Sequence, residues 1–140
     1  MADAATLATI ASIISGFGIA MLFFRIQREL QMREQLEFNW IPWADRLLIG
    51  ATLTSQLLVV FPLVAFSATS TVVVKCASAG CAAASLMAAG YVLGILAHYR
   101  LLFGKRRKGP RVNPEPAERV IVFAVVTAAL LAFGKVILAL

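Results

Sequence analysis

Charged residues are scarce in this sequence. They make up 14% of its 140 residues, while apolar residues make up 61%. A soluble domain carries about 25% charged and 45–50% apolar residues. A surface with so little charge needs lipid to cover it, which argues against a soluble protein. Because each membrane span takes about 20 residues, we expect a single membrane domain over residues 1–140 with four spans and little else.

The residue types of metal and catalytic sites are also rare. The sequence has one histidine and two cysteines, and this combination matches no Cys/His metal spacing. On one helix, Cys76 and Cys81 would lie about 8 Å apart at Cα, too far for a disulfide, although a loop would permit one. No nucleophile–base pair or carboxylate dyad falls at one membrane depth. The sequence therefore predicts neither an enzyme nor a bound cofactor or metal.

Four long stretches have almost no charge, and each exceeds the roughly 18 residues that mark a candidate span. Pro62 and the Ser/Thr-rich segment 67–71 place the end of the second helix near residue 66, unless a tilted helix continues to Val74. The first stretch has no Lys or Arg before it, so we expect a retained span rather than a signal peptide. The predicted fold is an all-α bundle of four transmembrane helices, with spans over about 4–24, 43–66, 76–103 and 118–140.

The basic residues predict the orientation. Eleven of the thirteen lie in segments 25–46 and 100–119. By the positive-inside rule, segments 25–42 and 104–117 are cytoplasmic and both chain ends lie on the opposite side, most simply in a bacterial inner membrane. Lys75 and Lys135 then fall on that opposite side. The charges are confined to short stretches between spans, so we expect lipid rather than nucleic acid as their partner.

The first helix is expected to extend into the cytoplasm. Arg25, Glu29, Arg33 and Glu37 recur every four residues and alternate in sign. This spacing aligns them on one helix face, where each pair is worth only about 0.2–0.5 kcal/mol. The extension is either solvated or in contact with a neighbouring subunit.

Two groups of residues are expected at the lipid headgroups. Tryptophan prefers the membrane interface, and clustered cations attract anionic lipid. The predicted headgroup residues are Trp40, Trp43, Lys105, Arg106, Arg107 and Lys108.

Small residues allow close helix approach where lipid supplies no hydrophobic drive. They recur on the first and third spans, and two such faces predict self-association or contact with other membrane subunits as well as packing within one bundle. The predicted packing residues are Ala8, Ser12, Gly16, Ala20, Gly80, Ala84, Gly90 and Gly94.

Few polar residues fall inside the spans. No Asp or Glu lies within the uncharged stretches, which argues against a proton-coupled exporter; Glu118 begins the fourth helix close to the bilayer. Gln56 is expected either to bond a neighbouring helix or to line a wet path, and Lys135 either to reach the headgroups or to line a pore. The candidate pore or buried polar residues are Gln56, Thr54, Ser55, Ser12 and Lys135.

These features favour a homo-oligomeric pore or channel-like protein. A non-catalytic accessory or assembly subunit of a larger membrane complex is the first alternative, because the sequence offers no catalytic group. The second is a membrane-permeabilising effector, similar in size to phage holins.

Overall fold

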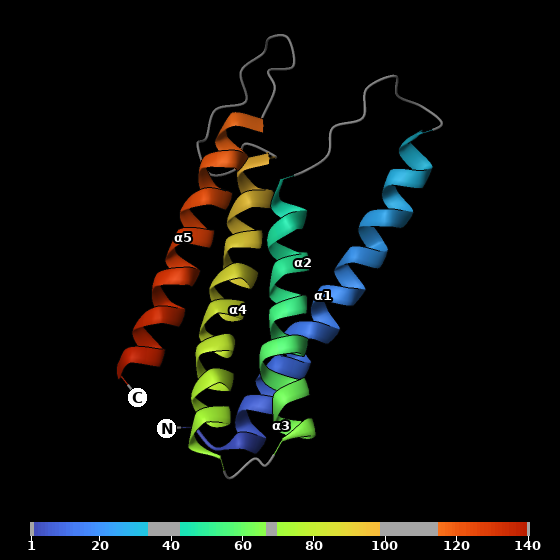
Figure 1. Ribbon diagram of the computed structural model, residues 1–140. Coiled ribbons are helices and arrows are strands. Elements are labelled where there is room, and N and C mark those ends of the chain that lie inside the picture. The colour runs from blue at the N-terminus through green and yellow to red at the C-terminus, as the bar shows by residue number, and fades with distance from the viewer. Residues whose placement is uncertain (1, 34–42, 67–69, 99–114, 140) are drawn as a thin grey trace.

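The computed structural model describes residues 2–33, 43–66, 70–98 and 115–139. Their regular structure is entirely helical: α1 (Ala4–Arg33), α2 (Ala44–Thr54), the π-helical turn η1 (Ser55–Val60), α3 (Phe61–Ala65), α4 (Thr71–His98) and α5 (Glu115–Ala139). Because α2, η1 and α3 follow one another without a break, the described residues form four helical rods, of which α2, η1 and α3 together make the second (Figure 1). Each rod contains a segment long and apolar enough to cross a membrane: Ala4–Arg28, Ala44–Ala65, Thr71–His98 and Pro116–Ala139. The prediction of four apolar helices is confirmed.

Two helices begin earlier than the sequence predicts. The third helix begins at Thr71, so Lys75 belongs to the helix rather than to the preceding turn. Its first turn is closed by a 3.0 Å bond from the Val74 N–H to the Ser70 carbonyl, which pairs backbone groups that hydrocarbon could not solvate. The fourth helix begins at Glu115 rather than near residue 118. The first helix continues to Arg33, past the end of its candidate span at Arg28, in line with the helical extension expected from the sequence. Glu37, Trp40 and segment 99–114 lie outside the described residues.

The second rod accommodates Pro62 with a wide turn. Proline has no N–H, and its ring collides with the carbonyl four residues earlier in an α-helix. In η1 the Phe61 N–H instead bonds the Gln56 carbonyl, five residues back. Regular α-helical bonding has resumed where the Phe66 N–H meets the Pro62 carbonyl at 3.0 Å. The rod therefore crosses Pro62 without ending there.

The rod of α4 lies at the centre of the bundle. Of the most apolar part of each rod, 44% is buried in α4 and 39% in the second rod, but only 22% in α1 and 11% in α5. The first and fourth rods are therefore the outermost ones. Small residues explain the difference, because they let both neighbours approach α4 closely.

Three glycines of α4 make these close contacts. A Cβ on Gly80 would lie 2.9 Å from the Leu58 Cβ, and one on Gly94 would lie 2.8 Å from the Ala44 Cβ. A Cβ on Gly90 would collide with Val125 of α5. These glycines fix the registers of α4 against the second rod and against α5.

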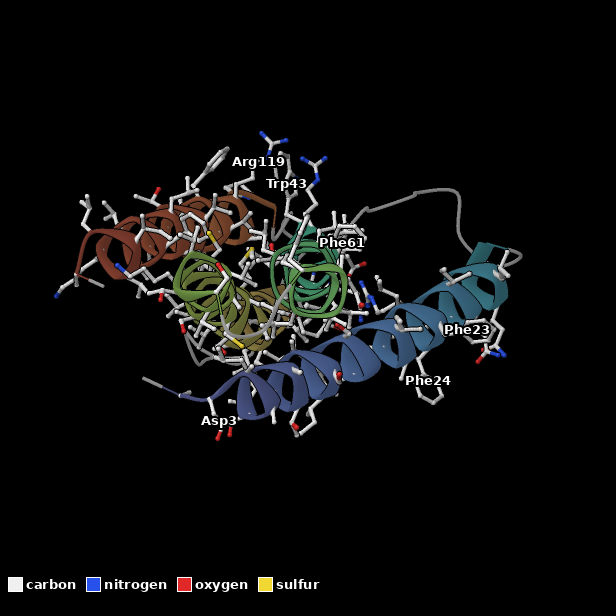
Figure 2. The ribbon with its side chains drawn as sticks, turned by 60° about the horizontal axis from the view of Figure 1, so that its bottom comes forward. Asp3, Phe23, Phe24, Trp43, Phe61 and Arg119 are labelled. Carbon is white, nitrogen blue, oxygen red and sulfur yellow. The ribbon has the colours of Figure 1, made fainter. Side chains whose placement is uncertain are left out.

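The rod of α1 crosses the others obliquely (Figures 1 and 2). Leu7 and Ala11 pack in a small core with Val59, Ala77 and Cys81. We call this part of the molecule the Cys81 end. Farther along, Phe23 and Phe24 are exposed, and Phe24 points away from the other helices (Figure 2).

Candidate functional site

Buried charged groups gather at the opposite end of the bundle, where α1 and α4 finish and α2 and α5 begin. Its central residue is Glu118, whose side chain is 2% exposed. One carboxylate oxygen lies 2.6 Å from Nδ1 of His98 on α4. The other accepts a 3.0 Å bond from the backbone N–H of Trp43, which precedes α2. We call this part the Glu118 end; a single carboxylate there ties three rods together.

The helix termini stabilise this arrangement. The N–H groups at the start of a helix favour negative charge, and the carbonyls at its end favour positive charge. Glu118 lies in the first turn of α5 and also accepts from the N–H of Trp43, the N-cap residue of α2, while His98 is the last residue of α4. The Glu118 carboxylate is therefore favoured by the starts of two helices. Without such partners, a buried carboxylate would be strongly unfavourable.

A second ion pair joins α1 to α2. Arg25 Nε lies 3.2 Å from Asp45 Oδ1 and donates to Oδ2 at 3.3 Å. The two side chains are only 12% and 20% exposed. Asp45 is also in the first turn of its helix, where a carboxylate is favoured.

The ring of Trp43 lies beside this network. The guanidinium carbon of Arg46 is 3.8 Å from the ring centre, and that of Arg119 is 4.7 Å from it. Phe123, one turn beyond Arg119 on α5, lies 6.2 Å away between ring centres. Two helices thus bring their arginines to one aromatic surface.

Two hydroxyl groups are buried midway along the interface between α1 and the second rod. Ser15 and Ser55 are 2% and 0% exposed, and neither hydroxyl has a hydrogen-bond partner among the described residues. Gly18 packs against the Thr52 hydroxyl, which itself donates to the Leu48 carbonyl at 2.9 Å. Because the two helices run antiparallel, this contact together with Arg25–Asp45 sets Ser15 opposite Ser55.

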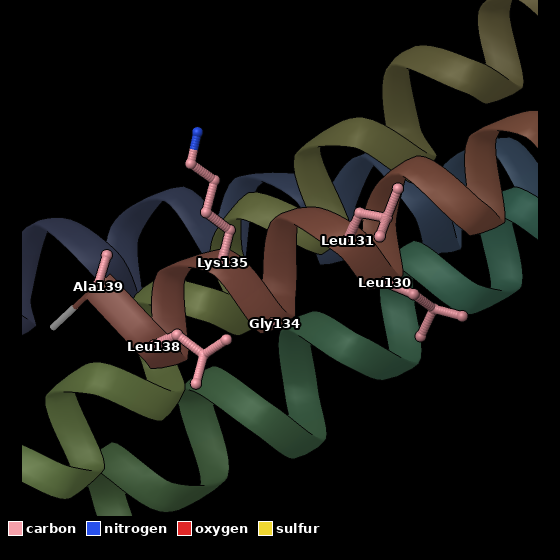
Figure 3. Close-up of a pocket in the computed structure, with 6 residues that line it drawn as sticks. All are labelled: Leu130, Leu131, Gly134, Lys135, Leu138 and Ala139. Carbon is pink, nitrogen blue, oxygen red and sulfur yellow. The ribbon is translucent and has the colours of Figure 1, made fainter.

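The five candidate pore residues lie on three rods and differ in exposure. Ser12 is exposed on α1, Ser55 is buried in the interface just described, and Thr54 and Gln56 are half-buried on the second rod. Lys135 lies beside an open, mainly apolar depression on α5, and its side chain extends away from that helix (Figure 3).

Asp3 caps the start of α1. Its carboxylate accepts a 2.6 Å bond from the Thr6 N–H, and this bond holds the pKa of Asp3 below its usual value.

The predicted packing residues divide into two groups. Gly80, Ala84, Gly90 and Gly94 are buried on α4, whereas Ala8 is only half-buried and Ser12, Gly16 and Ala20 are exposed on α1. Helix α1 packs instead through a neighbouring face of Leu7, Ala11, Ser15 and Gly18. Of the predicted headgroup residues, Trp43 lies at the Glu118 end; Trp40, Lys105, Arg106, Arg107 and Lys108 are outside the described residues.

Sequence reasoning did not find the pairing of His98 with Glu118. The sequence does place both residues at helix ends on the same side of the predicted topology. It does not indicate the register between the two helices, which brings the side chains together. The described parts of the chain contain no group of three or more His, Cys, Asp or Glu residues that could hold a metal ion. No protein-family description, curated protein or solved structure matches the chain.

Proposed function

We propose that the protein is a homo-oligomeric, pore-forming membrane protein whose copies meet through α1. The observation that carries this proposal is the outward face of α1, on which Ser12, Gly16 and Ala20 are exposed and open space surrounds the Gly16 Cα. Small residues permit another helix to approach closely, and hydroxyls can line a permeation route. Thr9 adds a further exposed hydroxyl-bearing residue to this face.

The filled interior of the bundle supports a pore between copies rather than within one. Leu47, Leu48, Tyr91 and Val122 form a packed core that is almost inaccessible. A conducting path through a single copy would have to displace these side chains, and protein interiors are packed as densely as organic crystals. The outward face of α1 requires no such rearrangement.

Orientation belongs to the same proposal. The eleven basic residues in segments 25–46 and 100–119 support a cytoplasmic position for the Glu118 end and an outer position for the Cys81 end. The membrane is then the inner membrane of a bacterium. Cysteine labelling from each side of that membrane tests this part separately.

Two matched glycine variants test the oligomeric pore. Gly16 and Gly134 are both helical glycines with nothing within 4 Å of an added Cβ, so each position has room within one copy for a side chain to begin, and Gly16→Leu and Gly134→Leu form a matched pair. In lipid nanodiscs, the native protein should give one discrete oligomeric mass, and planar bilayers should show unitary conductance. Gly16→Leu should abolish both, while Gly134→Leu retains them. A monomer without conductance contradicts the proposal.

An accessory role within a larger complex is the second candidate. It is favoured by the exposed apolar side chains that continue along α1, among them Ile26 and Leu30, which are 58% and 59% exposed. Leu30 lies beyond the end of the candidate span at Arg28, and an apolar side chain outside the hydrocarbon suits a protein partner. Co-purification with another membrane subunit at fixed stoichiometry, without a homo-oligomer, would favour this role.

A further inference from the structure

Lys135 of α5 carries a charge inside a candidate membrane span, and the proposed function does not use it. The span runs from Pro116 to Ala139, and its other charged residues, Glu118 and Arg119, lie close to its start at the Glu118 end. Lys135 lies toward the opposite end. An ionisable side chain within a span is costly in hydrocarbon, so it indicates a function and a partner of opposite charge.

The register of α4 against α5 gives the depth of Lys135. The two helices run antiparallel, and Gly90 of α4 meets Val125 of α5 (Figure 1). Continued along both helices, this register places Lys135 at the level of Gly80, nine residues after the start of α4 at Thr71. At about 1.5 Å per residue, this level is about 13 Å inside that helix end. The ammonium therefore approaches the headgroups only through the length of its side chain.

A depression in the surface of α5 adjoins the Lys135 side chain. It is open and mainly apolar, has a volume of about 550 Å³, and is lined by Leu130, Leu131, Gly134, Lys135, Leu138 and Ala139 (Figure 3). Gly134 leaves the room for it, since nothing lies within 4 Å of a Cβ added there. Because α5 is the least buried of the four rods, lipid rather than protein covers this surface in a single copy.

A cation beside an apolar depression suits an amphipathic ligand with a negatively charged head. The lysine ammonium has three donors and binds phosphate oxygens as a point charge. From Lys135 the depression continues to Leu131 and Leu130, which lie nearer the middle of the span. An acyl chain runs in this direction below its phosphate. A soluble phosphate would meet the ammonium alone and leave the depression unused.

We propose that Lys135 and the depression at Gly134 bind one anionic phospholipid, with its phosphate on the ammonium and an acyl chain along Leu131. The lipid belongs to the leaflet at the Cys81 end. This site is independent of the pore proposal, because it lies on α5 rather than on α1. It requires one bound lipid per chain, which general attraction to an anionic surface does not.

Native mass spectrometry of the full chain tests the site. The probes are phosphatidylglycerol and phosphatidylcholine with identical acyl chains, titrated into detergent-purified protein. We expect one phosphatidylglycerol per chain to bind in preference to phosphatidylcholine. Lys135→Gln should lower the phosphatidylglycerol affinity about fivefold, the contribution of one basic residue near an anionic surface. Lys135→Arg keeps the charge and should retain the affinity.

Matched variants distinguish a site from surface attraction. Lys75→Gln removes one positive charge from α4 at the same end of the bundle and should not change the affinity. Gly134→Leu fills the depression without a change in charge and should weaken phosphatidylglycerol binding. Since Gly134→Leu leaves the outward face of α1 intact, its effect on lipid is separable from any loss of the oligomer. Circular dichroism must show native helicity in every variant.

Three outcomes would overturn the proposal. The first is equal retention of the two lipids by the native protein. The second is an equal loss of affinity for Lys75→Gln and Lys135→Gln, which would mean attraction by overall charge. The third is displacement of phosphatidylglycerol by soluble glycerol phosphate at similar concentration, which would mean that the acyl chain contributes nothing.

Discussion

The two ends of the bundle are held together by different physics. At the Cys81 end, Leu7, Ala11, Val59, Ala77 and Cys81 pack as small or aliphatic groups, and the Cys81 thiol donates a 3.6 Å bond to the Leu7 carbonyl. At the Glu118 end, the pairs Arg25–Asp45 and His98–Glu118 and the Trp43 N–H add polar links between rods to an apolar core. Close packing tolerates no added volume, whereas paired charges tolerate no lost partner. Different kinds of substitution should therefore destabilise the two ends.

The largest loss of stability is expected from Glu118→Ala. It removes the acceptor that His98 and the Trp43 N–H share, and leaving a buried donor unsatisfied costs about 1–3 kcal/mol for each donor, more where the pair is charged. Thermal unfolding in detergent should show a large fall in Tm. Glu118→Gln, which keeps an acceptor for the Trp43 N–H, should lose less. A Glu118→Ala protein as stable as the native one would remove the basis for the contrast between the ends.

The second-largest loss of stability is expected from added side-chain volume in the interfaces of α4. Gly90→Val forces new methyl groups into Val125 of α5, and overpacking costs about 1–3 kcal/mol. Gly134→Val, on the neighbouring helix but in open space, serves as the control. Equal Tm values for the two variants would show that α5 does not pack on α4 in this register.

Removal of a buried, unpaired hydroxyl should increase the stability of the folded protein instead of lowering it. Ser55 is fully buried and its hydroxyl has no partner in the described structure. Because burying an unpaired hydroxyl costs about 1–3 kcal/mol, Ser55→Ala should raise the stability, by about 1 kcal/mol. Thr52→Val, at a hydroxyl that donates to the Leu48 carbonyl, is the comparison and should give no gain. A loss of stability in Ser55→Ala would indicate a bound water between the helices.

The smallest effect concerns the cap at Asp3, beyond the membrane span. The Thr6 N–H bond lowers the pKa of Asp3 in the folded chain, so the cap contributes stability above the carboxyl's unfolded pKa. That contribution is lost as the pH falls through the lowered folded value. The Thr6 amide resonance should follow this titration by NMR. Asp3→Asn should keep the cap and remove the titration; an Asp3 titration at the usual pKa would contradict the bond.

The four spans could be predicted because hydropathy depends on each segment alone. The pairing of Glu118 with His98 depends on the register of α5 against α4, which the contact of Gly90 with Val125 sets. No property of either helix taken alone encodes that register. The π-helical turn before Pro62 was equally hidden, since the sequence indicates a missing N–H but not how the backbone compensates for it.

The face on which α1 packs illustrates the same limit. Ala8, Ser12, Gly16 and Ala20 form a regular small-residue series, but Ala11, Ser15 and Gly18 form another on the neighbouring face. Either series permits close approach. The partner decides between them: Gly18 meets the Thr52 hydroxyl, and Arg25, farther along the same helix, meets Asp45. The residues of the first series consequently face away from the other helices.

Disulfide cross-linking in native membranes tests the outward face of α1 most directly. With Cys76 and Cys81 replaced by alanine, Ser12→Cys places a thiol on that face, and Leu131→Cys places one on the exposed side of α5, where Leu131 is 69% exposed. Mild oxidation should give a covalent dimer from Ser12→Cys and none from Leu131→Cys. If Ser12→Cys stays monomeric, or if both variants cross-link equally, copies of this chain do not meet through α1.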